Sequence, residues 1–239
     1  MDRLTLPWRR SCPLPADHRP RTVDHPLCAR LYARQSVQAE RLGLAARRAQ
    51  LLEGLTGRVL EIGAGNGLNF RHYPATVDEV VAVEPERHLR ELAVTAVAEA
   101  PVPVQVVDAL AEELPAANAA FDAAVASLTL CSIGDVERAL AELHRVVRPH
   151  GELRFLEHVA SPRRTARALQ RAADATVWPR VAGGCHLARD TDRLIEEAGF
   201  EIVRCERFAF RIPPLDPPKT HIIGVARRAD SAPRAPDRA

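Results

Sequence analysis

The sequence predicts an α/β fold, with one doubly wound, seven-stranded and mostly parallel sheet in a single domain. Short β-branched runs alternate along the chain with longer stretches of helical periodicity, which is typical of parallel strands joined by right-handed crossovers. The chain has 239 residues, of which 46% are hydrophobic and 27% are charged, so its length and composition suit one hydrophobic core.

The N-terminal residues precede the expected sheet. Residues 1–23 contain four prolines, which rule out a continuous helix, and five arginines, which make the segment basic. We therefore expect a flexible basic arm. Over residues 24–53, apolar side chains recur at helical spacing, with Asp24 as a candidate cap and Gly43 as a candidate break. This segment is expected to form one or two amphipathic helices that act as a lid.

The sheet is expected to begin after these helices, and we place the main domain at residues 54–228. Its first five strands are expected at 58–62, 79–83, 102–107, 121–126 and 153–159. Helices are expected in the same part of the chain at 86–99, 135–147 and 162–176.

The end of the domain is expected to differ from this pattern. A helix at 190–198, closed by Gly199, precedes strands near 201–207 and 221–226. No crossover helix separates these two strands, so they are expected to form an antiparallel hairpin that ends the sheet. Residues 229–239 are rich in proline and arginine, and we expect a disordered tail there.

Charge and cysteine content disfavour several classes of protein. The 33 basic and 31 acidic side chains give a net charge of +2, which is too small to predict nucleic-acid binding. The five cysteines form no Cys-x-x-Cys pair, so neither a disulfide framework nor a metal site is expected. No apolar run approaches a membrane span, and we expect a cytoplasmic protein whose oligomeric state stays open.

A glycine-rich turn follows the first expected strand. Gly63, Gly65 and Gly67 lie between this strand and an expected helix, where the backbone can approach a ligand closely. A dinucleotide fingerprint has its third glycine three residues after the second, but that position is Leu68 here. The spacing therefore disfavours an NAD-linked oxidoreductase, and the acidic Glu61 before the turn indicates a different ligand.

Two more acidic residues end the next two strands. Glu84 ends the second strand, where a carboxylate can accept hydrogen bonds from both hydroxyls of a ribose. Asp108 ends the third strand, where it can accept a hydrogen bond from an adenine amino group. Together with Glu61, these carboxylates converge on one crevice, and they suit a cationic sulfonium better than a pyrophosphate.

These motifs resemble those of class I S-adenosylmethionine-dependent methyltransferases, whose sheet is Rossmann-like. Residues 60–67 correspond to motif I, Glu84-Pro85 to motif II and Asp108-Ala109 to motif III of that family. The resemblance implies S-adenosyl-L-methionine as the cofactor and favours a small-molecule methyl acceptor. The residues implied in cofactor binding are Glu61, Gly63, Ala64, Gly65, Gly67, Glu84, Pro85, Asp108, Ala109 and Leu128.

Four further segments carry a narrower resemblance. They are residues 67–73, 130–132, 155–158 and 183–191. They resemble a methyltransferase-like group whose animal members methylate alkyl thiols and whose bacterial relatives are often labelled phospholipid N-methyltransferases. A thiol or another soft nucleophile is therefore the preferred acceptor, a phospholipid is the alternative, and stable membrane insertion is not expected.

Residues beyond the fourth and fifth strands are expected to face the acceptor. These candidates are Cys131, His158, Trp178, Cys185 and His186. His158 and His186 are the catalytic candidates, because an imidazole can take a proton from a thiol or amine near neutral pH, and a structural role stays open for both. Cys131 is expected to be a small buried apolar residue. A cofactor-binding sensor without catalysis also stays open, since none of the motifs is itself catalytic.

Overall fold

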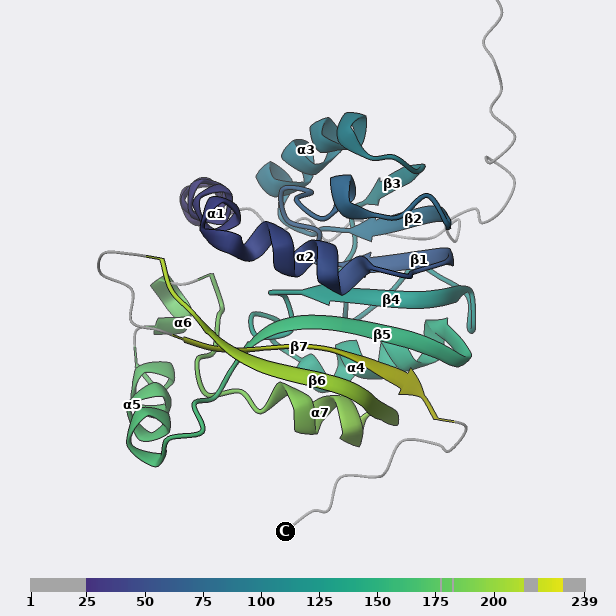
Figure 1. Ribbon diagram of the computed structural model, residues 1–239. Coiled ribbons are helices and arrows are strands. Elements are labelled where there is room, and N and C mark those ends of the chain that lie inside the picture. Colours follow the sequence, from purple (N-terminus) through teal and green to yellow (C-terminus); the bar gives the residue numbers. More distant parts are fainter. Residues whose placement is uncertain (1–24, 177, 182, 213–218, 230–239) are drawn as a thin grey trace, which may run out of the picture.

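The computed structural model describes residues 25–176, 178–181, 183–212 and 219–229. Within them, seven strands form one sheet, and helices cover both of its faces (Figure 1). The expected basic arm at 1–23 lies outside the described residues, as does all of the expected tail at 229–239 except Ala229.

The strand order in the sheet is β3-β2-β1-β4-β5-β7-β6. The strands are β1 (Gly57–Ile62), β2 (Val77–Val83), β3 (Val104–Val107), β4 (Phe121–Ser127), β5 (Val147–Val159), β6 (Phe200–Phe210) and β7 (Lys219–Arg228). The first five strands pair in parallel, whereas β7 pairs antiparallel with both β5 and β6. The predicted mostly parallel sheet with an antiparallel C-terminal pair is confirmed. The chain builds the sheet outward in one direction from β1 to β3 and in the opposite direction from β4 onward, so the topological switch point lies between β1 and β4. In open α/β sheets, ligands bind at the carboxyl ends of the strands beside this switch point.

Helices lie on both faces of the sheet. They are α1 (Pro26–Ala39), α2 (Ala45–Leu52), α3 (Arg87–Ala96), α4 (Val136–Val146), α5 (Arg164–Asp174), α6 (Trp178–Val181) and α7 (Thr191–Glu197). α2 and α3 pack on one face, and α4 and α7 pack on the other (Figure 1). The helices predicted at 86–99, 135–147, 162–176 and 190–198 are found as α3 with the 3₁₀ turn Val97–Glu99, α4, α5 and α7.

Two strand boundaries differ from the prediction. β3 begins at Val104 rather than at residue 102, because Pro103 has no amide hydrogen to donate to a neighbouring strand. β5 begins at Val147, earlier than the predicted 153, and its pairing with β4 then shifts in register. The shift coincides with His150, whose φ of 63° turns the backbone away from a regular strand.

The start of α1 differs from the prediction, whereas the break after it is confirmed. The N-cap residue is His25, and Pro26 occupies the first turn; Asp24, the predicted cap, lies outside the described residues. Proline suits this position because it has no amide hydrogen to leave unpaired and its φ is already helical. At Gly43 the φ is 115°, and a π-helical turn (Glu40–Leu44) separates α1 from α2.

The crossover from β1 to β2 contains no α-helix, so the expected helix after the glycine-rich turn is wrong. The described chain forms only a 3₁₀ turn there (Phe70–His72). Few residues lie between Gly67 and β2, and Pro74 interrupts them, so a full helix cannot form. The aromatic side chains of Phe70 and Tyr73 are buried in its place.

α2 covers the face of the sheet that this crossover leaves bare. Leu51 and Leu52 at the end of the helix are buried in one cluster with Phe70, Val59 of β1 and Leu156 of β5. The N-terminal helical segment is therefore part of the hydrophobic core through α2.

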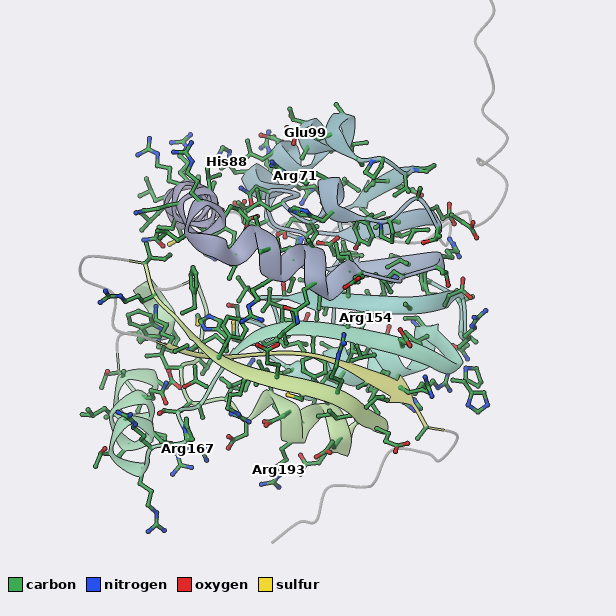
Figure 2. The ribbon with its side chains drawn as sticks, viewed as in Figure 1. Arg71, His88, Glu99, Arg154, Arg167 and Arg193 are labelled. Atoms are coloured by element: carbon green, nitrogen blue, oxygen red, sulfur yellow. The ribbon has the colours of Figure 1, made fainter. Side chains whose placement is uncertain are left out.

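Arg154 of β5 holds the C-terminal end of α2 against the sheet. Its guanidinium donates hydrogen bonds to the carbonyl oxygens of Leu51 (3.3 Å) and Glu53 (3.1 Å), and it pairs with Glu152 at 2.7 Å. Carbonyl groups at a helix end have no partner within the helix, so this contact satisfies them. Figure 2 shows Arg154 between α2 and β5.

We predict that Leu52→Ala lowers the free energy of unfolding by about 2–5 kcal/mol, because it opens a cavity under α2. Urea denaturation measures this loss. Leu42→Ala is the control, since Leu42 is 44% exposed and its truncation is expected to cost no more than about 0.5 kcal/mol. A small and equal effect of both changes would show that α2 does not belong to the core.

Candidate active site

The glycine-rich turn at the end of β1 is held in a left-handed conformation. The φ angles of Gly63 and Gly65 are 59° and 57°, and the amide of Ala64 donates a hydrogen bond to Val83 of β2 at 3.0 Å. A Cβ at Gly63 would clash with the side chain of Thr129, whose hydroxyl donates to the Gly63 carbonyl at 3.1 Å. Glycine is therefore required where this turn meets the loop after β4.

Glu84 joins the turn to the end of β2. One oxygen of its buried carboxylate accepts a hydrogen bond from the Gly65 amide (2.7 Å), and the other accepts one from the Glu86 amide (2.9 Å). Burial raises the pKa of Glu84 to about 7, although both amide bonds favour the ionised form. The residue predicted to hold a ribose thus also fixes the backbone of the turn, and Pro85 follows it at the start of the loop to α3.

Arg90 of α3 brings the ends of β2 and β3 together. It pairs with Asp108 at 2.9 Å and donates hydrogen bonds to the carbonyl oxygens of Glu84 (3.0 Å) and Pro85 (2.9 Å). Ala109, next to Asp108, is fully buried. The structure therefore places the motif II and motif III residues side by side, as the parallel strands predict.

Glu61 lies beneath the turn. Its carboxylate accepts hydrogen bonds from the side-chain amide of Asn69 (2.8 Å) and from the hydroxyl of Tyr73 (2.7 Å). Burial raises the pKa of Glu61 to about 7. Both oxygens are thus used inside the protein, so Glu61 supports the crossover after Gly67, and a direct contact of Glu61 with a cofactor stays a prediction.

Tyr32 and Arg48 bring the N-terminal helices into the site. A Cβ on Gly65 would lie 3.4 Å from the ring of Tyr32. Tyr32 is 36% exposed, yet its hydroxyl end lies deep enough that burial raises its pKa to about 12; the charge of Arg48 opposes this rise, and that of Glu84 adds to it. Tyr32 therefore lies over the glycine-rich turn.

Arg48 connects α2 to the strand ends. Its buried guanidinium donates to Asn69 (2.9 Å) and to the hydroxyl of Ser127 (2.9 Å), and it pairs with Glu40 at 2.8 Å. Sequence reasoning missed this residue. An arginine on the apolar face of an amphipathic helix was the signal that could have shown it.

Glu157 organises the loop after β4. Its fully buried carboxylate accepts hydrogen bonds from the backbone amides of Thr129 (3.0 Å), Leu130 (3.0 Å) and Cys131 (3.3 Å). Burial outweighs these bonds and raises the pKa of Glu157 to about 7. Leu128 precedes this loop with a φ of 57°. Sequence reasoning missed Glu157, although an acidic residue inside an apolar strand was a usable signal.

His158 and Cys185 meet at the end of β5. His158 is buried, and its Nδ1 lies 4.0 Å from the Sγ atom of Cys185. The His158 ring lies 5.5 Å from that of His221, its partner residue on β7. Cys131 lies beside Cys185, because the amide of the next residue, His186, donates to the Cys131 carbonyl at 2.8 Å. We call these four residues, Cys131, His158, Cys185 and His221, the thiol–imidazole cluster.

His186 lies beside this cluster. Its backbone amide donates a hydrogen bond to the carbonyl oxygen of Cys131 at 2.8 Å, and its Nδ1 lies 3.4 Å from the guanidinium of Arg189. Arg189 in turn donates to the carbonyl oxygens of Leu130 and, at 2.9 Å, Ile133. The structure thus brings His158 and Cys185 together and connects the loop that holds His186 to the loop after β4.

Trp178 lies in α6, and the ammonium of Lys219 is 5.5 Å from the centre of its ring. Cys131 is buried as predicted, and the neighbouring Cys185 thiol, together with burial, raises its pKa; the sequence did not indicate this neighbour. Among the described residues, no three His, Cys, Asp or Glu side chains gather as a metal site.

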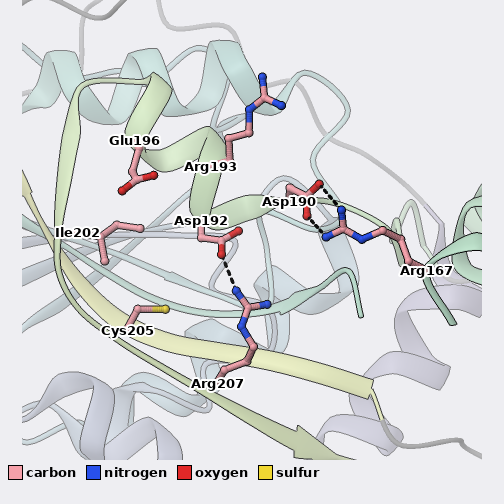
Figure 3. Close-up of a pocket in the computed structure, with 8 residues that line it drawn as sticks. All are labelled: Arg167, Asp190, Asp192, Arg193, Glu196, Ile202, Cys205 and Arg207. Carbon is pink, nitrogen blue, oxygen red and sulfur yellow. Dashed lines mark hydrogen bonds and ion pairs between the residues drawn. The ribbon is translucent and has the colours of Figure 1, made fainter. Parts of the chain in front are cut away.

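An open cavity of about 620 Å³ lies between α7 and β6 (Figure 3). Four of its lining charges are paired with each other, Arg167 with Asp190 and Arg207 with Asp192, both at 2.6 Å, and Arg193 pairs with Glu197. None of the predicted site residues lines the cavity. Across the described ranges, no helix has both the length and the apolar character needed to cross a bilayer.

Comparison with known proteins identifies the family. Residues 60–155 match a family model described as a methyltransferase domain. The thiol S-methyltransferase TMT1B of Mus musculus is 34% identical over 182 residues, which are 73% of this chain and 73% of that protein. The ubiquinone/menaquinone biosynthesis C-methyltransferase UbiE of Syntrophotalea carbinolica is 30% identical over 179 residues, which are 70% of this chain and 74% of that protein.

Solved structures share the fold. An S-adenosylmethionine-dependent methyltransferase from Mesorhizobium loti superposes with a TM-score of 0.53 at 20% identity, over 78% of this chain and 99% of that one. Its fold, the sequence identity to the two curated relatives and the acidic strand ends around a glycine-rich turn agree with one another. On these grounds the chain belongs to the class I S-adenosylmethionine-dependent methyltransferases.

Proposed function

We propose that this methyltransferase acts on a small-molecule thiol. One observation carries the proposal: the loop after β4 joins the two ends of the site, because the Thr129 hydroxyl donates to the Gly63 carbonyl at 3.1 Å and the Cys131 carbonyl accepts from the His186 amide at 2.8 Å. The glycine-rich turn and the acceptor candidates are therefore connected by this loop. Relatives named thiol S-methyltransferases support the choice of acceptor.

The residues around the turn fit the cofactor. Gly65 leaves a cradle that a side chain would close against Tyr32. Carboxylates at Glu84 and Asp108 are acceptors that suit ribose hydroxyls and an adenine amino group, and with Glu61 they suit a positive charge. When bound, S-adenosyl-L-methionine supplies an electrophilic methyl group on its sulfonium.

His158 is the proposed base for the acceptor thiol, and His186 is the second candidate. His158 is buried at the end of β5, and its Nε2 has no hydrogen-bond partner among the described residues, so this atom is available to an acceptor. A thiol becomes a strong nucleophile once it loses its proton, so a nearby imidazole favours the reactive form. His186 belongs to the loop connected to Cys131, from which it can bind or position the acceptor.

The N-terminal helices are the proposed lid. Methyl transfer depends on aligned reactants in a pocket without water. α1 carries Tyr32 over the turn, and α2 carries Arg48 to the strand ends, so residues 24–53 are proposed to cover the main domain at 54–228, with α2 fixed on the sheet and α1 as the part that closes. The cytoplasm stays the proposed location.

Two other functions are testable against this one. A sensor that binds the cofactor without catalysis predicts no methylated product from any thiol, amine or phenol. A phospholipid N-methyltransferase predicts transfer to vesicles that contain an amino-headgroup phospholipid. Incubation with each acceptor and a cofactor labelled in its methyl group separates the three functions.

Glu84→Gln is expected to weaken the binding of S-adenosylhomocysteine, because the ribose loses a charged acceptor. The loss is expected to be on the order of 1.5–3 kcal/mol, or roughly 10- to 150-fold in Kd, by calorimetry. Glu99→Gln is the matched control, since Glu99 is exposed and pairs with Arg71 at the surface (Figure 2). Unchanged affinity in a folded Glu84→Gln protein contradicts the assigned role of Glu84.

The affinity for S-adenosylhomocysteine is expected to fall as the pH drops below 7. Burial raises the pKa of Glu84 to about 7, so the free protein holds a proton on this carboxyl at lower pH. Ribose hydroxyls donate to the ionised form, so binding must release that proton, at a cost of up to about tenfold in Kd per pH unit. Calorimetry between pH 5 and 8 measures the slope, which Glu84→Gln is expected to flatten. A slope that persists in this variant assigns the effect to other groups.

His158→Asn is expected to lower kcat/KM for a thiol by about 10² or more, with a smaller loss at high pH, where the acceptor ionises without help. His186→Asn and the double variant test the second candidate. His150→Asn is the control, because His150 is exposed near the opposite end of β5. If the double variant turns over thiols at the wild-type rate at pH 6 and pH 8, neither histidine is the base.

A further inference from the structure

The thiol–imidazole cluster contains two cysteines from distant parts of the chain. Cys131 follows β4, and Cys185 lies in the loop that leads to α7. The amide of His186, the residue after Cys185, donates a hydrogen bond of 2.8 Å to the Cys131 carbonyl, which brings the two cysteine backbones together. A disulfide needs two cysteines whose backbones lie this near each other.

The two thiols have different surroundings. Cys185 is partly exposed, lies 4.0 Å from the Nδ1 of His158, and its pKa is lowered to about 5, chiefly by its contact with Cys131. Cys131 is 4% exposed, and that contact, its burial and the charge of Glu157 raise its pKa. Arg189 lies close to both thiols. One thiol is therefore accessible and reactive, and the other is protected behind it.

We propose that Cys131 and Cys185 form a dithiol modification site, which a hydroperoxide oxidises to a disulfide. The Cys185 thiolate attacks a peroxide oxygen; the O–O bond breaks, and the leaving hydroxide or alkoxide takes up the proton that the thiol had lost, leaving a sulfenic acid on Cys185. The Cys131 sulfur then attacks the Cys185 sulfur, and the S–O bond breaks. The hydroxide that leaves Cys185 takes up the proton of the Cys131 thiol and forms water. In total, two thiols and one peroxide become one disulfide, one alcohol or water, and one further water.

The disulfide blocks the acceptor end of the site, a consequence that rests on the proposed function. It ties the loop that holds Cys185 to the loop after β4 and removes the thiol beside His158. The residues around the glycine-rich turn are not part of the bond. Oxidation is therefore expected to stop methyl transfer and to leave the affinity for S-adenosylhomocysteine unchanged. A thiol acceptor slowly reverses the block by thiol–disulfide exchange.

The test is peptide mapping of the purified full chain after treatment with equimolar hydrogen peroxide and alkylation of the remaining thiols. The expected result is a linked pair of peptides that contain Cys131 and Cys185, which dithiothreitol separates. Initial rates with a thiol, taken before the acceptor reduces the bond, are expected to fall with the extent of linkage. If these two cysteines stay alkylated, or link to other cysteines instead, the proposal is overturned.

Three variants make the test specific. Cys131→Ser is expected to stop at the sulfenic acid of Cys185, which dimedone labels, and Cys185→Ser is expected to give no link. Cys205→Ser is the control, because Cys205 is exposed on β6 and its loss should leave the link intact. Circular dichroism confirms that each variant folds, and Cys131→Ala replaces Cys131→Ser if it does not. If the disulfide forms but neither the reduced nor the oxidised protein transfers a methyl group, the proposed function is overturned and the dithiol modification site is still supported.

Discussion

The hydrogen bond from the Gly65 amide to the Glu84 carboxylate connects the two strand ends on which the cofactor site is built. The turn before Gly65 is left-handed, a conformation that few residues adopt, and Glu84 fixes where its amides point. Burying this carboxylate costs free energy, as its raised pKa shows, and the amides of Gly65 and Glu86 offset part of that cost. The backbone of the turn is therefore positioned by the carboxylate that is proposed to hold the ribose.

The same arrangement occurs at two other strand ends. Glu157 at the end of β5 accepts hydrogen bonds from three backbone amides of the loop after β4. Glu61 near the end of β1 accepts hydrogen bonds from two side chains of the crossover to β2. Each buried carboxylate thus holds one loop. Arg48 brings positive charge near Glu61, and Arg90 brings it near Glu84. Irregular loops are kept in place here by buried hydrogen bonds to carboxylates as well as by apolar packing.

The sheet and the glycine-rich turn could be predicted from the sequence because both are local patterns. The alternation of strands and helices predicted the parallel sheet, and the spacing of Gly63, Gly65 and Glu84 predicted a turn at the strand ends, which the structure contains. The absence of a crossover helix had a local signal in Pro74 and the short segment before β2, but its replacement could not be predicted, because Leu51 and Leu52 precede β1 and reach the gap only through the tertiary fold. For the same reason the partners of Arg48 and the closeness of Cys131 to Cys185 could not be predicted. Their partners lie far away in sequence.

The position of α2 has a consequence for how the site opens. α2 is anchored to the sheet by Arg154 and by its buried leucines, whereas α1 buries only the small side chains of Ala29, Ser36 and Ala39. Gly43 lies between the two helices with a backbone conformation that few other residues tolerate. If the N-terminal helices act as the proposed lid, Gly43 is the point at which α1 would turn relative to α2, and that turn would carry Tyr32 away from Gly65.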